Sequence, residues 1–229
     1  MVIEKLFVRG LLIFAVLIGF NSSVPVLAQD GPNVARILLG DITNAFESVG
    51  IVGSVGRGGF CSGTLISPTH VLTAAHCAEI IDNPSSGTFE VGGNLYLTSD
   101  VFIHPNYNSN NLENDLAILE LREPVSGIEP SPIYRSIPTI GETLTIVGFG
   151  ATGTAIGGSD GTFGIKRAGE TTIDRVTARL VIWKFDSPSE ANTANGDSGG
   201  PGFLVRGGER FVASVTSGGT VFNLSLIHI

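Results

Sequence analysis

Three short segments of the 229-residue chain carry a serine, a histidine and an aspartate that could act together. Ser198 lies in the glycine-rich segment Gly196–Pro201, His76 lies next to a cysteine, and Asp115 opens the apolar run Leu116–Leu119. A serine hydroxyl is a poor nucleophile unless a neighbouring base takes its proton. An imidazole can do this near neutral pH, and a shielded carboxylate can hold the imidazole in the required tautomer. The three residues therefore predict nucleophilic catalysis with Ser198 as nucleophile, His76 as base and Asp115 as orienting group.

Each of these residues also has an ordinary structural explanation. A histidine beside Cys77 is commonly structural, and an aspartate at the start of a strand commonly caps a turn. A glycine-rich segment is commonly only a turn. The joint occurrence of all three segments is what favours chemistry over these explanations.

The rest of the chain predicts an all-β protein in two halves. Glycine supplies 31 residues, and short apolar runs are separated by turn residues. The strands expected in the first half are Val49–Val55, Gly63–Ile66, His70–Thr73, Thr88–Val91, Leu95–Leu97, Val101–Ile103 and Leu116–Leu121. Those expected in the second half are Thr143–Val147, Lys166–Val176, Ala178–Phe185, Gly202–Val205 and Phe211–Thr216. We expect one helical turn over Ala74–Cys77 and a long exposed loop over Gly148–Gly164.

The three segments resemble the catalytic blocks of the trypsin/chymotrypsin family of serine proteases, in that family's order of His, Asp and Ser. The segments that carry the resemblance are Cys61–Ile66 with Leu72–Cys77, Asn114–Leu121 and Gly196–Pro201. The likeness extends from about residue 37 to about residue 219. It implies two packed antiparallel Greek-key β-barrels of the trypsin-like fold, the second incomplete at its C-terminal end.

The resemblance also implies an activity and an oxyanion hole. The expected activity is that of a secreted serine endopeptidase, which hydrolyses peptide bonds of protein or peptide substrates through an acyl-enzyme intermediate. The tetrahedral oxyanion needs two converging backbone N–H donors. By the resemblance these belong to Gly196 and Ser198. No cofactor and no metal are expected. The segment Lys166–Gly169 and the glycine-rich loop before it resemble bacterial secreted members of the family.

In this family, cleavage after a basic residue frees a new N-terminal isoleucine. The corresponding residue here is Ile37. It lies 24 residues before Cys61, which is the family's separation between the new N-terminus and that cysteine. The resemblance implies that an activating protease cuts after Arg36, and that the freed ammonium of Ile37 pairs with Asp197. The sequence there reads Ile-Leu-Leu-Gly where the family usually has Ile-Val-Gly-Gly. The alternative is that Arg36 and Ile37 are an ordinary entry into a strand.

The residues that correspond to the specificity pocket are atypical. Asn192, six residues before Ser198, occupies the position at the base of the primary pocket. A neutral side chain there argues against a simple preference for Arg or Lys. Ala194 replaces the usual cysteine, so the disulfide of this pocket is absent. The segment that resembles the edge pairing with substrate backbone consists of Ser217, Gly218 and Gly219.

The two ends of the chain differ in character from its middle. Residues 1–28 resemble a signal peptide with a basic start, an apolar run and a small-x-small cleavage pattern, although an N-terminal membrane anchor is the alternative. We expect a short pro-segment over 29–36, the peptidase domain over 37–223 and a non-native tail over 224–229 that gives His228 no function. The expected location is extracellular or periplasmic, with no stable membrane association after the signal is removed.

Cysteine content and charge add two constraints. Exported proteins retain disulfides, so Cys61 and Cys77 are expected to pair. The alternatives are two free thiols or a metal pair with His76, but no further Cys/His cluster completes a coordination sphere. The formal net charge of −8 disfavours a nucleic-acid partner.

Two other functions compete with an active protease. One is a catalytically inactive homologue that acts as an extracellular binding module. The intact set of His76, Asp115 and Ser198 argues against it. The other is an esterase built around the Gly-x-Ser-x-Gly pattern, which needs its histidine after the serine. His228 is the only histidine after Ser198, so the residue order argues against this function.

Overall fold

The computed structural model describes residues 40–151, 153–154, 158–159, 163–187, 189–220 and 224–228. The expected signal peptide, the pro-segment and Ile37 lie outside these residues. Strands dominate the described chain, which confirms the all-β prediction, and its helical elements are the short α1 (Ala75–Ala78) and η1 (Pro84–Ser86). Among the described residues, no helix has the length and apolar character needed to cross a membrane.

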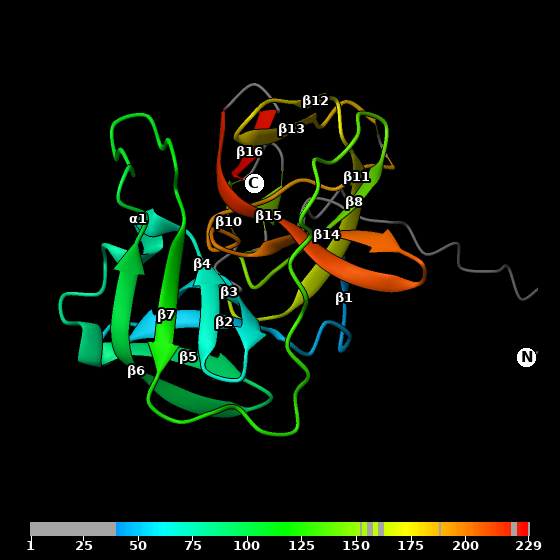
Figure 1. Ribbon diagram of the computed structural model, residues 1–229. Coiled ribbons are helices and arrows are strands. Elements are labelled where there is room, and N and C mark those ends of the chain that lie inside the picture. The colour runs from blue at the N-terminus through cyan, green and yellow to red at the C-terminus, as the bar shows by residue number, and fades with distance from the viewer. Residues whose placement is uncertain are drawn as a thin grey trace, which may run out of the picture. The chain divides into compact units, whose positions relative to one another are not determined.

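The first half forms a closed antiparallel barrel with the strand order β2-β3-β4-β7-β6-β5. Its strands are β2 (Val49–Ser54), β3 (Gly58–Ser67), β4 (His70–Thr73), β5 (Gly87–Val91), β6 (Asn94–Ile103) and β7 (Ala117–Leu121), coloured blue to green in Figure 1. In β7, every second residue is buried, as expected for a strand with one face in a core. The barrel core includes Val52, Leu65, Phe89 and Leu119, all fully buried.

The second half forms an eight-stranded antiparallel sheet with the order β1-β11-β8-β14-β15-β16-β13-β12. Its strands are β1 (Asp41–Ile42), β8 (Thr143–Gly148), β11 (Arg167–Thr172), β12 (Arg175–Val176), β13 (Leu180–Lys184), β14 (Pro201–Arg206), β15 (Glu209–Thr220) and β16 (Leu224–His228). A core around Leu144, Ile146 and Trp183 packs within it. In the part of the chain that is described, β1 and β12 do not pair, so this sheet is open where the first barrel is closed.

Two Gly-Gly turns connect strand pairs in both halves. Gly92 and Gly93 join β5 to β6, and Gly207 and Gly208 join β14 to β15. All four have positive φ, between 59° and 85°. Two-residue hairpins need this left-handed backbone to match the twist of their strands, and glycine adopts it without a steric penalty.

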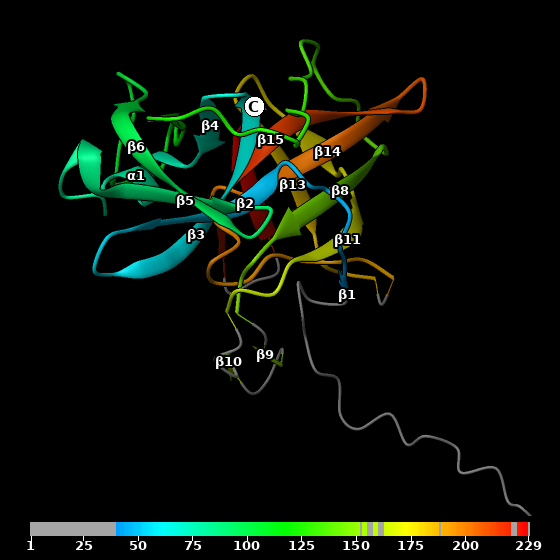
Figure 2. The ribbon, with the colours of Figure 1, turned by 90° about the horizontal axis from the view of Figure 1, so that it is seen from below.

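A shared cluster joins the two halves. Val49 of β2 packs with Val147, Phe203 and Val212 of the eight-stranded sheet. In Figure 2, β1 lies alongside β11, in agreement with the pairing of Asp41 with Ala168. Apolar side chains from both halves therefore share one buried cluster.

Several expected elements differ from those observed. The two expected runs Leu95–Leu97 and Val101–Ile103 belong to one strand, β6, with an irregularity between Thr98 and Asp100. The single strand expected over Lys166–Val176 is wrong, because Ile173 turns back to hydrogen-bond Glu142 and separates β11 from β12. The expected loop Gly148–Gly164 carries a small hairpin, β9 (Gly153–Thr154) with β10 (Gly158–Ser159).

The segment expected as a non-native tail takes part in the sheet. Leu224–His228 forms β16, which pairs with β15 on one side and with β13 on the other. The origin of residues 224–229 stays a prediction.

Candidate active site

The predicted base and orienting group are in direct contact. His76 lies in α1, directly after β4, and Asp115 lies just before β7. The Nδ1 of His76 lies 2.7 Å from Oδ2 of Asp115, and the backbone N–H of His76 donates to Oδ1 at 2.8 Å. Because an ionised carboxylate only accepts hydrogen bonds, Nδ1 carries the proton and Nε2 is left to act as the base.

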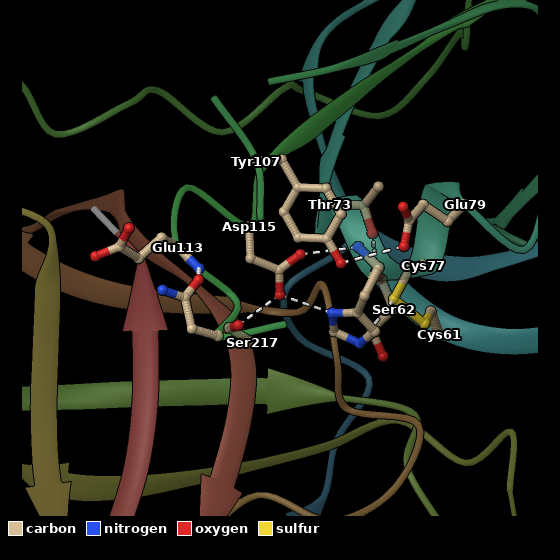
Figure 3. A network of polar contacts seen from close by, with 11 residues as sticks. Cys61, Ser62, Thr73, Cys77, Glu79, Tyr107, Glu113, Asp115 and Ser217 are labelled. Carbon is tan, nitrogen blue, oxygen red and sulfur yellow. Dashed lines mark hydrogen bonds and ion pairs between the residues drawn. A yellow bond between two sulfur atoms is a disulfide. The ribbon is translucent and has the colours of Figure 1, made fainter. Parts of the chain in front are cut away.

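Asp115 is buried, and its carboxylate accepts three hydrogen bonds. Its side chain is 0% exposed, and the hydroxyl of Ser217 also donates to Oδ2, at 2.5 Å. Burial alone would raise the pKa of Asp115, but the hydrogen bonds from His76 and Ser217 outweigh it and hold the pKa below its usual value. Figure 3 shows the carboxylate between Tyr107 and Ser217. Asp115 is therefore an anion suited to stabilise a charged imidazole.

A backbone hydrogen bond joins Ser198 to the first barrel. It is half-buried, and its carbonyl accepts a hydrogen bond of 2.8 Å from the N–H of Ser62 in β3. Within the described chain its hydroxyl makes no hydrogen bond to His76. Such contacts are often long in the absence of substrate and shorten in the reacting complex.

Hydrogen bonds hold the peptide groups around Ser198 in place. The carbonyl of Asn195 accepts from Ala151, that of Asp197 from Gly200, and the N–H of Gly199 donates to Thr216. Within residues 196–200 of the described chain, the N–H groups of Gly196 and Ser198 are the ones without a protein acceptor. These are the two donors that the sequence predicts for an oxyanion hole.

Gly199 is required by space as well as by backbone geometry. Its φ is +81°, and an added Cβ would lie 2.1 Å from Oγ1 of Thr73 and 2.2 Å from the carbonyl oxygen of Ser62. Any side chain at this position would push the turn away from the barrel. The close approach of the two halves therefore depends on this glycine.

Asp197 is a second buried carboxylate, directly before the nucleophile. Its side chain is 1% exposed and accepts hydrogen bonds of 2.8 Å from the N–H groups of Gly150 and Ala194. Burial raises the pKa of Asp197 to about 6, although these two bonds and the charge of Arg167 oppose the rise. Its proposed partner, Ile37, lies outside the described residues.

The expected disulfide is confirmed. Cys61 and Cys77 are bonded, with their Cα atoms 6.2 Å apart, so β3 is covalently joined to the helical turn that carries His76. The two sulfur atoms lie near the His76 ring. Because they are bonded to each other, they cannot act as thiolate ligands of a metal.

The residues predicted to bind substrate divide into two groups. Asn192 is half-buried in the segment before the nucleophile. Ser217, Gly218 and Gly219 lie in β15, where β16 pairs on one side. On the other side, pairing with β14 ends at Val215 in the described chain. Among the described residues, no strand pairs with that edge beyond Val215, and its role in binding substrate backbone stays a prediction.

A cavity that the sequence analysis did not identify lies beside Ser217. Its volume is about 350 Å³, and its lining consists of Asn111, Leu112, Glu113, Thr177, Ala178, Arg179, Leu180 and Ser217. Residues 111–113 precede β7, whereas residues 177–179 connect β12 to β13 and Leu180 begins β13. The sequence held no signal for it, because its walls come from loops far apart in the chain.

Tyr107 was also missed. Its hydroxyl donates to Oε2 of Glu79 at 3.2 Å, and burial, together with the charges of Asp115 and Glu79, raises its pKa. The phenol therefore stays neutral beside the catalytic pair. A lone tyrosine in the polar stretch before Asp115 gives no sequence signal for this position.

Comparison with known proteins shows the family. The model of the family described as Trypsin matches residues 44–225. The chain belongs to the trypsin family. This match includes His76, Asp115 and Ser198, and it agrees with the observed barrel and disulfide.

Individual trypsin-family relatives are similar at modest identity. Brachyurin from Leptuca pugilator is 31% identical over 163 residues, covering 62% of this chain and 70% of its own. A venom serine protease from Polistes dominula is 31% identical, covering 61% of this chain and 58% of its own. A trypsin from Phaedon cochleariae is 31% identical, covering 63% and 64%. These relatives are animal proteins, so they do not support the bacterial likeness expected from Lys166–Gly169.

Proposed function

We propose that this trypsin-family chain is a secreted serine endopeptidase with His76, Asp115 and Ser198 as its triad. The observation that carries the proposal is the buried Asp115 carboxylate bonded to both the ring and the backbone of His76. The N–H groups of Gly196 and Ser198, which have no protein acceptor among the described residues, add to it. The curated relatives named as serine protease and trypsin support the same class of reaction.

The proposed reaction has two halves. Nε2 of His76 takes the Ser198 proton as Oγ attacks the scissile carbonyl, and the oxyanion is held by the N–H groups of Gly196 and Ser198. The charged imidazole, stabilised by Asp115, then gives its proton to the leaving amine and leaves an acyl-enzyme. In the second half, water attacks the ester and His76 takes a proton from that water. His76 passes this proton to Oγ of Ser198 as the bond to the acyl group breaks and the acid product leaves.

Activation by cleavage after Arg36 is part of the proposal. Ile42 pairs with Arg167, which pairs with Gly148, and a Cβ on Gly148 would lie 2.2 Å from Oδ1 of Asp197. Ile42 therefore lies two strand spacings, about 10 Å, from the strand position beside Asp197. Ile37 is five residues earlier, a reach of about 17 Å of extended chain. An ammonium there would compensate the buried carboxylate.

The proposed substrates are proteins or peptides, taken without a cofactor. The neutral Asn192 supports a preference other than Arg or Lys at the primary position. We further propose secretion by a signal peptide over 1–28, a pro-segment over 29–36 that an activating protease removes, and an extracellular or periplasmic location.

The test is covalent labelling of Ser198 with a fluorophosphonate probe, followed by a peptide-library cleavage profile. We expect labelling and cleavage by the processed enzyme, with both absent in Ser198→Ala. Asn192→Asp, profiled in parallel, should shift cleavage toward Arg and Lys. A folded, processed wild type without labelling would support the alternative, an inactive homologue that acts as a binding module. The observation that favours this alternative is that the Ser198 hydroxyl makes no hydrogen bond to His76 within the described residues.

A further inference from the structure

Ser62 connects the first barrel to both residues of the proposed oxyanion hole. It follows Cys61 in β3 and is 0% exposed. Its backbone N–H donates to the carbonyl of Ser198 at 2.8 Å, and its hydroxyl donates to the carbonyl of Gly196 at 2.9 Å. One residue thus holds the carbonyls of the two residues whose N–H groups have no acceptor in the described part of the chain.

The direction of the hydroxyl bond is fixed by a third contact. The N–H of Phe149 donates to Oγ of Ser62 at 3.0 Å, so the hydroxyl accepts from Phe149 and gives its own proton to Gly196. Such chains of hydrogen bonds polarise and strengthen one another. Phe149 also lies between Gly148 and Gly150, the two glycines against the Asp197 carboxylate. Ser62 therefore joins the surroundings of Asp197 to the nucleophile turn.

The peptide between Gly196 and Asp197 is held at both ends. Its carbonyl accepts from Ser62, and its N–H donates to Ala194 at 3.0 Å. Gly196 has φ of +95° and no side chain of its own to limit rotation. Without the Ser62 hydroxyl, this peptide would keep only the Ala194 bond, and Gly196 could turn its own N–H away from the oxyanion.

We propose that Ser62 is a positioning residue, whose hydroxyl holds Gly196 so that its N–H stays directed at the oxyanion. The proposal rests on the proposed protease function. Ser62 does not touch the reacting atoms; it acts through the Gly196–Asp197 peptide.

The decisive experiment compares Ser62→Ala with wild type on a fluorogenic peptide taken from the library profile. The variant keeps the backbone bond to Ser198 and loses only the hydroxyl. Deleting an oxyanion donor outright costs about 100- to 1,000-fold in kcat, and a donor that is present but no longer held should cost less. We expect kcat to fall about 10- to 100-fold, with KM changed less than about twofold. The inhibition constant of the matching peptide boronic acid, which forms a tetrahedral adduct, should rise by the same factor as kcat falls.

Controls separate positioning from folding. Ser48→Ala removes another buried hydroxyl of the same half, one bonded to Ser131 at 2.7 Å, and should leave kcat unchanged. Ser62→Gly is a second way to delete the hydroxyl and should match Ser62→Ala. Thermal unfolding and active-site titration normalise kcat to folded enzyme.

The outcomes distinguish the two proposals. An active wild type with unchanged kcat in both Ser62 variants overturns the positioning role alone. The positioning role is also overturned if the loss in kcat disappears once kcat is normalised to the amount of folded enzyme. A processed wild type that hydrolyses no peptide overturns the proposed function, and the role of Ser62 with it.

Discussion

Asp115 and Asp197 are both buried carboxylates, yet their surroundings differ. Asp115 receives hydrogen bonds from two side chains and one backbone N–H, and its pKa is lowered. Asp197 receives two backbone N–H bonds, and its pKa is raised to about 6. Burial opposes ionisation in both, so the difference comes from the donors and charges nearby.

The two carboxylates differ in how far their surroundings stabilise the negative charge. Asp115 is ionised with partners that belong to the described fold, so its charge is ready to stabilise the imidazolium of His76. The charge of Asp197 is only partly compensated, and a further cation would favour its ionised form. The first arrangement suits a permanent catalytic role, whereas the second suits a switch controlled by a cation that arrives later.

The largest effect is expected from Asp115→Asn. The amide can present its NH₂ group to Nδ1 of His76 and favour the tautomer that cannot take the Ser198 proton. We expect kcat to fall about 10,000-fold, measured on the profiled peptide. Asp100→Asn, an exposed carboxylate of the same barrel, is the control and should keep full activity. A loss below tenfold would contradict the role of Asp115.

Asp197→Asn should have the next largest effect. It removes the charge that the freed ammonium of Ile37 would meet, so the oxyanion turn should lose its activated arrangement and kcat should fall about 100- to 1,000-fold. Arg36→Ala, which cannot be cut, should show a similar loss. Asp186→Asn, an exposed carboxylate, serves as the control. Full activity in uncut Arg36→Ala would refute activation by a new N-terminus.

The two carboxylates should also give opposite slopes of stability against pH. The raised pKa of Asp197 means that the folded state holds its proton more tightly than the unfolded chain, so its contribution falls as pH rises from about 4 to about 6. The lowered pKa of Asp115 contributes stability that is present above the ordinary pKa of an aspartate. This stability is lost as the pH falls below that value and through the lowered pKa of the folded state.

Denaturant unfolding of uncut protein carrying Ser198→Ala isolates the Asp197 contribution. Between pH 4.5 and 7, we expect its free energy of unfolding to fall by about 2 kcal/mol relative to the same protein with Asp197→Asn. Equal slopes in the two proteins would show that Asp197 titrates normally.

The smallest effect is expected from Ser217→Ala. Losing one of the three donors to Asp115 should raise the pKa of that carboxyl and lower kcat about tenfold, the scale of one hydrogen bond to a charged group. Ser214→Ala in the same strand is a matched control, because its buried hydroxyl has no hydrogen-bond partner in the described chain. Equal kcat in the two variants would mean that the Ser217 bond does not tune Asp115.

Sequence patterns were informative where chemistry or periodicity is local. The apolar run Leu116–Leu121 predicted a strand that the structure contains as β7 (Ala117–Leu121), because the residue preferences of a strand depend on neighbouring residues. The break at Ile173 was not predictable from Lys166–Val176, because it comes from a hydrogen bond to Glu142, 31 residues earlier.

The sequence by itself determined the residue types of the candidate site and their order, together with the all-β class and the cysteine pair. Only the tertiary structure decided that Ser217 bonds to Asp115 and that Ser62 holds both oxyanion carbonyls. It also decided that Asp197 is buried against Gly148 and Gly150. Each of these contacts joins residues at least 47 positions apart, and no local pattern encodes a pairing that depends on how two halves of a chain pack.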